Sequence, residues 1–225
     1  MESGFGMAHF VAHSDLLGRG VFVLLLGLSV ASWYLIMVKS VDNWVMHKRA
    51  DRFLKKFRDA ASLQEMELML DAQSGGEPFS LLASRALAVK RGNLVGTERL
   101  LAAGGMPEYL ARVLRNGIDQ EATKVERSLT VMASVGSVAP FIGLFGTVWG
   151  IYHALVQIGT SGQASLDKVA GPVGETLIMT AVGLAVAIPA VLAYNSFIRR
   201  NRVWLARLDN FAHDLYTLVA VDTRF

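Results

Sequence analysis

Three apolar runs without a formal charge divide the chain, at 20–38, 129–158 and 176–198. A helix of about 20 apolar residues crosses a hydrocarbon core roughly 30 Å thick, and each run is long enough to do so. The pattern therefore predicts an all-α membrane protein with three transmembrane helices. The first run is too long for the apolar part of a signal peptide, so we expect it to be a retained helix.

Basic residues are distributed unevenly around these runs. The flank before the first run has Arg19, and the loop between the second and third runs has Lys168. Far more follow the first and third runs: Lys39, Lys48, Arg49, Arg52, Lys55, Lys56, Arg58, Arg199, Arg200, Arg202 and Arg207. By the positive-inside rule, the N-terminus and the short loop are periplasmic, whereas the large loop and the C-terminus are cytoplasmic.

The pattern predicts that two of the helices extend beyond the membrane. No strong breaker pair interrupts the stretch from Pro107 to Ile158, and apolar residues recur at helical spacing after Ile198. The apolar stripe of this tail packs either on the chain's own loop helices or on another subunit. The expected divisions are an N-terminal periplasmic or interfacial segment (1–18), transmembrane helix 1 (19–38), a cytoplasmic helical loop domain (39–128), transmembrane helix 2 (129–158), a short periplasmic loop (159–168), transmembrane helix 3 (169–198) and a cytoplasmic C-terminal helix (199–225).

Composition narrows the possible functions. Hydrophobic residues make up 52% of the chain and charged residues 18%, a balance that favours lipid over water. Cysteine is absent, which excludes disulfides and thiolate metal sites. No phosphate-binding loop, nucleophile elbow or His-Glu-x-x-His motif supports an enzyme, and we expect no cofactor. Basic residues are nearly matched by acidic ones, which argues against a nucleic-acid partner.

Two histidines near the N-terminus are the one candidate for a metal site. His9 and His13 are four residues apart, so they share a helix face, and Asp15 is the nearest third ligand. An amphipathic helix at the membrane interface explains the surrounding apolar residues better. We therefore predict no metal site.

Small residues form one face of the second run, at alternating spacings of four and three. They are Gly136, Pro140, Gly143, Thr147, Gly150 and Ala154, and Gly146 forms a Gly-x-x-x-Gly pattern with Gly150. The third run repeats the spacing with Thr176, Thr180, Gly183, Ala187 and Ala190. Helices in lipid associate through close backbone approach at such residues. The two faces are expected to pack on each other, on a second copy of the chain, or on a foreign helix.

Two threonines lie near the predicted bilayer midplane. Thr147 is eleven residues from the outer end of its run at Ile158, and Thr180 is eleven residues from Val169, where the third helix is expected to enter the membrane. Each distance is about 16 Å at 1.5 Å per residue. Each hydroxyl either serves a polar path or bonds its own i−4 carbonyl. Glu175 lies nearer the outside, either as a helix-start acid or in a polar cavity or ion path.

A proton path needs a group near the midplane that binds and releases protons. The second and third runs contain no carboxylate at the level of Thr147 and Thr180, and threonine does not titrate in the useful range. If the protein conducts protons, another polypeptide must supply the central carboxylate.

Two segments, APFIGLFGTVWGI (139–151) and ETLIMTAVGLAVAIPAVLAYN (175–195), strongly resemble the ExbB/TolQ proton-channel family, whose distant relatives include the flagellar stator subunit MotA. The resemblance implies a pentameric homo-oligomer in the bacterial inner membrane. Its central lumen would hold the single membrane helix of an ExbD- or TolR-type partner, on which an aspartate titrates. A TonB- or TolA-type transducer would relay the energy to the outer membrane. Thr147 matches the pore threonine of the second helix, and Glu175 and Thr180 match the glutamate and threonine of the third.

One departure from the family pattern affects Glu175. This chain has AGPVGET where the family commonly has APGIAEA, so the proline is shifted by one position. The start of the third helix is therefore expected to differ slightly near Glu175.

Three functions are compatible with these residues. An ExbB-like motor subunit that energises TonB-dependent uptake is preferred, because the loop and the tail do not resemble TolQ. A TolQ-like subunit that maintains outer-membrane integrity is the first alternative. The second is a non-conducting membrane scaffold, in which the small-residue faces only hold an oligomer together.

Overall fold

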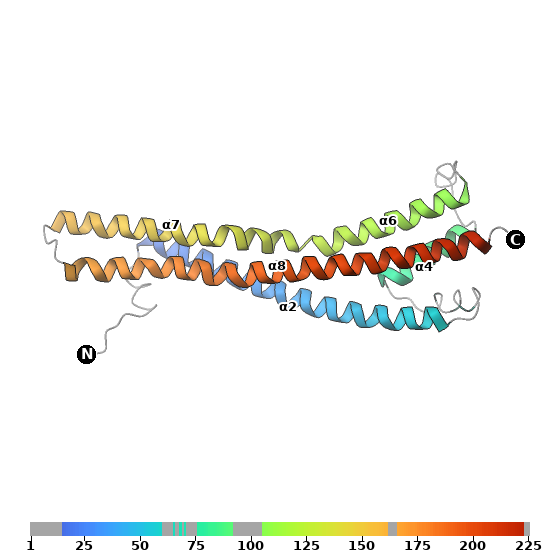
Figure 1. Ribbon diagram of the computed structural model, residues 1–225. Coiled ribbons are helices and arrows are strands. Elements are labelled where there is room, and N and C mark those ends of the chain that lie inside the picture. Colours follow the sequence, from blue (N-terminus) through green and yellow to red (C-terminus); the bar gives the residue numbers. More distant parts are fainter. Residues whose placement is uncertain are drawn as a thin grey trace. The chain divides into compact units, whose positions relative to one another are not determined.

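The computed structural model describes residues 15–59, 65, 68, 70, 76–91, 105–161 and 166–222 (Figure 1). At 161, 166–170, 175 and 220–222 it describes the backbone alone. Every element in these ranges is a helix: α2 (Leu16–Asp59), α4 (Pro78–Lys90), α6 (Met106–Glu126), α7 (Leu129–Ser161) and α8 (Leu166–Asp222). Three helical stretches are long and apolar enough to cross a membrane. The prediction of an all-α membrane protein with three transmembrane helices is confirmed.

The helices contribute to two compact units, each with its own hydrophobic core. The apolar unit is formed by the described parts of 1–38 and 128–197, and the polar unit by the described parts of 39–127 and 198–225. The helices α2 and α8 each contribute residues to both units. The predicted continuation of the third run into the tail is confirmed, because α8 is one helix from Leu166 to Asp222.

The apolar unit has a core of small and medium side chains from α2, α7 and α8. Its buried members are Val21, Leu25, Val135, Ala139, Met179, Val186, Ala187 and Ala190. Large apolar side chains such as Phe141, Val148 and Leu192 are exposed on the same helices. In water such a surface would be unfavourable, whereas in a bilayer it contacts lipid tails. Prolines occur inside two of these helices: Pro140 in α7, and Pro172 and Pro189 in α8.

The polar unit is centred on a cluster of aromatic residues. Phe79 of α4 contacts Trp204 and Phe211 of α8, with ring centroids 5.2 and 5.3 Å apart. Phe211 also packs edge-on against Phe53 and Phe57 of α2. The tail's apolar stripe therefore packs on helices of its own chain, which is one of the two alternatives left open by the sequence.

Gly105 and Pro107 lie at the start of α6. Gly105 has φ 91° and ψ 169°, a conformation that side chains disfavour, and Pro107 lies in the first turn. Gly117 does not break the helix. A Cβ at this position would collide with Leu82 of α4, so glycine here permits α4 and α6 to pack closely.

The continuous helix expected from Pro107 to Ile158 is interrupted. A turn at Arg127 and Ser128 separates α6 from α7. Just before the turn, the Val125 carbonyl accepts hydrogen bonds from Lys39 Nζ at 2.8 Å and Asn201 Nδ2 at 3.0 Å. Side-chain donors that reach a helical carbonyl compete with the i→i−4 ladder and bend or break it. No glycine or proline marks the site, so the sequence pattern did not reveal the turn.

Some predictions concern residues outside the described ranges. His9 and His13, the candidate metal ligands of the sequence, lie there, as does most of the N-terminal segment 1–18. The short loop at 159–168 is described only in part.

Candidate functional site

The helices α7 and α8 approach most closely at two glycines. A Cβ added to Gly143 would lie 2.6 Å from the Met179 carbonyl oxygen and 3.0 Å from the Gly183 Cα. A Cβ added to Gly183 would lie 2.7 Å from the Ala139 carbonyl oxygen. Both obstacles are backbone atoms that cannot rotate away. These two positions therefore require glycine for the observed packing.

The remaining small residues continue this contact along the helices. A Cβ at Gly136 would come within 2.5 Å of Val191 Cγ2, and one at Gly150 would collide with Thr176 of α8. Gly146 lies against two helices: a Cβ added to it would lie 3.1 Å from Met179 Cε of α8 and 3.1 Å from Val21 Cγ1 of α2. Ala187 is buried and Pro140 half-buried. The small-residue face of α7 is thus occupied largely by α8 of the same chain.

The hydroxyl group of Thr147 lies in the contact between α7 and α8. The residue is 5% exposed. Its Oγ1 lies 2.6 Å from Thr180 Oγ1, 3.1 Å from the Thr176 carbonyl oxygen and 3.1 Å from the carbonyl oxygen of Gly143, the residue four positions earlier. A hydroxyl donates one hydrogen and accepts others. Thr147 therefore has one hydrogen for three acceptors: it donates either to a carbonyl oxygen, and then accepts from Thr180, or to Thr180 Oγ1 itself.

Thr180 differs from Thr147 in being half-buried. Both threonines of the sequence prediction are thus brought together, but Thr180 is the more accessible. The third predicted residue, Glu175, lies in α8 directly before Thr176, and its side chain is outside the described residues. In sequence, α7 contains no Asp, Glu, Lys or Arg, so the hydroxyl pair has no charged neighbour on that helix.

A second polar contact joins α2 to α7, and sequence analysis did not identify it. Asp15 caps the start of α2, because the Gly18 N–H donates to its Oδ1 at 2.8 Å. Trp149 Nε1 donates to the other carboxylate oxygen at 2.6 Å, and His153 Nε2 lies 4.0 Å from that oxygen. In the sequence, an aspartate just before an apolar run indicates a helix cap, and Asp15 could have been identified as one. The spacing of residues does not indicate that this carboxylate also contacts Trp149 of α7.

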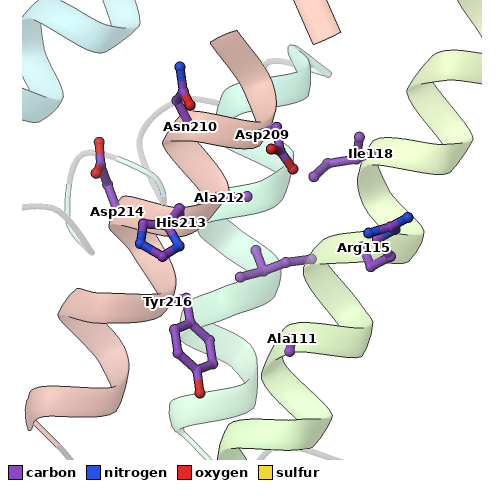
Figure 2. A pocket seen from close by; sticks show the side chains of 10 residues that line it. Ala111, Arg115, Ile118, Asp209, Asn210, Ala212, His213, Asp214 and Tyr216 are labelled. Atoms are coloured by element: carbon purple, nitrogen blue, oxygen red, sulfur yellow. The ribbon is translucent and has the colours of Figure 1, made fainter. Parts of the chain in front are cut away.

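A pocket of about 550 Å³ lies in the polar unit between α6 and α8 (Figure 2). It is lined by Ala111, Leu114, Arg115, Ile118, Asp209, Asn210, Ala212, His213, Asp214 and Tyr216. Acidic and basic side chains are mixed, so the pocket does not select strongly for a ligand of one charge. The sequence predicted the tail helix and the helix from Pro107, but not that these two helices together line a pocket.

Comparisons with known proteins agree with the membrane pattern. The family model described as the MotA/TolQ/ExbB proton channel family matches residues 85–210. A protein named biopolymer transport protein ExbB from Xanthomonas campestris pv. campestris is 42% identical over 207 residues, which cover 91% of this chain and 82% of the relative. The ExbB of Neisseria meningitidis is 44% identical over 199 residues, covering 88% and 89% respectively. The Tol-Pal system protein TolQ of Pseudomonas aeruginosa is 33% identical over 218 residues, covering 95% and 92%.

Proposed function

Because the chain belongs to the MotA/TolQ/ExbB proton channel family, we propose that it is the ExbB-like channel and motor subunit of a TonB-type energy-transducing system. In this proposal the chain forms a ring, expected to be a pentamer, in the inner membrane. The ring surrounds the membrane helix of an ExbD-like partner and passes energy from the proton gradient to a TonB-like transducer. The N-terminus is periplasmic and the C-terminus cytoplasmic.

The observation that carries the proposal is the hydroxyl pair of Thr147 and Thr180. An ionised carboxylate near the centre of a membrane is unfavourable unless polar groups surround it. When Thr147 donates to Thr180 Oγ1, the single hydrogen of the half-buried Thr180 hydroxyl is left to be donated to such a carboxylate. A partner aspartate is thereby stabilised as an anion beside Thr180 and released from it when protonated.

Through this exchange, each subunit of the ring binds the partner helix and then releases it. A proton from the periplasm neutralises the aspartate, the hydrogen bond to Thr180 weakens, and the partner helix moves relative to the ring. Release of the proton to the cytoplasm restores the anion next to another copy of Thr180. Glu175, five residues earlier in α8, is proposed to lie on the periplasmic side of this path.

The higher identity to ExbB than to TolQ favours uptake over outer-membrane maintenance. A TolQ-like role is the alternative supported by the match to TolQ over most of the chain. A deletion strain separates the two roles. Loss of growth on iron-siderophore complexes supports the ExbB-like role, whereas detergent sensitivity with normal iron acquisition supports the TolQ-like role.

The channel itself is tested with the chain and its partner purified together in liposomes. Proton flux should follow an imposed pH gradient and should stop when the membrane aspartate of the partner is replaced by asparagine. Flux that is unchanged by this replacement, or energised uptake that persists with it, would favour the non-conducting scaffold.

A further inference from the structure

Glu77 is a buried acid that the proposed channel does not use. It is 8% exposed and directly precedes α4, with an extended backbone at φ −80° and ψ 136°. Its side chain forms no capping hydrogen bond. Both carboxyl oxygens are shielded from water, and neither has a hydrogen-bond partner within the part of the chain that the structure describes. Burial without partners favours the neutral form of a carboxyl group over the charged form.

The position of Glu77 ties its charge to the packing of α4. The next three residues, Pro78, Phe79 and Ser80, are all buried. Phe79 places its ring between Trp204 and Phe211 at the centre of the polar unit. A movement of the Glu77 carboxyl group out of the core would therefore pull on the first turn of α4 and on the Phe79 ring.

The charged group that acts on Glu77 is Arg49, an exposed residue of α2. Burial raises the pKa of Glu77 to about 7, although the charge of Arg49 acts in the opposite direction. Three other titratable groups on the packed helices have partners of their own: His47 contacts Asn43 and Trp204, Asp51 pairs with Arg207, and Glu121 pairs with Lys124.

We propose that Glu77 is a pH-sensitive latch of the polar unit. As a neutral acid it keeps the first turn of α4 in the aromatic cluster, and on losing its proton it moves outward to water and Arg49, which loosens α4. The latch itself requires no particular membrane orientation. Its exposure to cytosolic pH rests on the proposed function, in which the polar unit is cytoplasmic and loosens as the cytosol becomes alkaline.

The direction of the pH effect follows from linkage. A carboxyl group with a raised folded-state pKa contributes stability that is fully present below its usual value of 4.5 and is lost as the pH rises through about 7. Opening of α4 should therefore become easier at higher pH. Between about pH 6 and about pH 8 the protection of its amides should fall on the order of tenfold.

Hydrogen exchange of the full-length protein in detergent micelles tests the latch. After correction for the intrinsic pH dependence of exchange, amides of α4 should lose protection as the pH rises. The Glu77→Gln variant should remove this loss, because glutamine keeps the shape but has no proton to release. The matched control is Glu121→Gln, which alters another buried glutamate that has an ion-pair partner, and it should leave the pH dependence intact.

Three results would overturn the latch. One is a Glu77→Gln variant with the pH dependence of the wild type, and another is a Glu121→Gln variant that loses it. The third comes from infrared spectroscopy of the wild type, which remains decisive if Glu77→Gln fails to fold. A buried carboxylic acid should give a band that disappears between about pH 6 and about pH 8, and lack of this change contradicts the proposal. None of these measurements depends on proton conduction.

Discussion

Gly143 and Gly183 face each other where α7 and α8 cross, and a Cβ on either one would lie 3.0 Å from the Cα of the other. The contact sets the distance between the two helices, and the Thr147 and Thr180 hydroxyls meet one turn away along the same face. Close packing and the polar pair are thus two properties of one helix interface.

Alanine at either glycine should separate the helices. Gly143→Ala and Gly183→Ala each press a methyl group against fixed backbone atoms, and overpacking of this kind typically costs about 1–3 kcal/mol. Thermal unfolding of the purified protein should show both variants to be less stable. The matched control is Gly159→Ala in α7, because no atom lies within 4 Å of its added Cβ. Equal stability of all three variants would contradict the proposed role of the crossing.

Valine at Thr180 should abolish energised uptake without preventing assembly. Valine has nearly the shape of threonine, and a membrane hydrogen bond contributes only about 0.6 kcal/mol on average, so the fold should persist. The hydroxyl that would receive the partner carboxylate is lost. Growth on iron-siderophore complexes measures uptake, and co-purification of the partner measures assembly.

Thr130→Val is the control for this experiment, because Thr130 is an exposed threonine of α7. It should leave uptake unchanged. Thr147→Val should reduce uptake through misplacement of Thr180, and Thr147→Ser should restore it in part. Normal uptake with Thr180→Val would remove the main support for the channel proposal.

Glu175→Gln tests whether the acid near the start of α8 acts through its charge. On the proposed path it supplies a group that exchanges protons, so glutamine should abolish uptake while the complex still assembles. Asp167→Asn changes another carboxyl group in the same part of α8 and should have little effect. Uptake that survives Glu175→Gln would remove Glu175 from the proposed proton path; a helix-start acid is not an alternative, because α8 begins nine residues earlier, at Leu166.

The bonds to the Val125 carbonyl should stabilise the polar unit. Asn201 is 7% exposed, and Asn201→Leu removes one of the two side-chain donors to this oxygen. Loss of a buried hydrogen bond with an unsatisfied partner costs about 1–3 kcal/mol, although Lys39 remains as a donor and should keep the loss near the lower end. Chemical unfolding should detect it. The control is Asn210→Leu, at an exposed asparagine of the same helix, and it should leave the free energy of unfolding nearly unchanged. If both variants lower the free energy of unfolding equally, the hydrogen bond from Asn201 to Val125 has no specific role.

The contact between Asp15 and Trp149 should couple the start of α2 to α7. Asp15→Ala removes both the helix cap and the acceptor for the indole N–H, and loss of a cap costs about 0.5–2 kcal/mol. Trp149→Phe removes only the N–H donor. If the contact stabilises the fold, the double variant should be less destabilised than the sum of the single variants. Strict additivity would show that the contact contributes nothing.

The sequence predicted most of the apolar unit because lipid imposes strong constraints. A helix satisfies its backbone hydrogen bonds within one segment, so a single long apolar run in a bilayer indicates a helix directly. The spacing of Gly136, Gly143 and Gly150 placed them on one face of a helix. It did not select the partner, since α8, a second copy of the chain and a foreign helix all accept a small-residue face.

The polar unit shows where sequence reasoning was insufficient. The turn at Arg127 and Ser128 depends on donors that are distant in sequence, Lys39 and Asn201, and no local pattern indicates that they meet at one carbonyl. The burial of Glu77 is similar, because an acid after two glycines is typical of an exposed loop. Its burial goes with that of the start of α4, where Phe79 packs on Trp204 and Phe211 of α8, contacts that only the tertiary structure brings together.

The prolines inside α7 and α8 have a mechanical consequence. Proline has no amide hydrogen, so Pro140 and Pro189 deprive the carbonyls of Gly136 and Ala185 of the donors that an ordinary helix provides. A helix bends more readily where its ladder is incomplete. Bending of either helix is therefore least opposed at these two levels, which lie within the membrane-spanning runs.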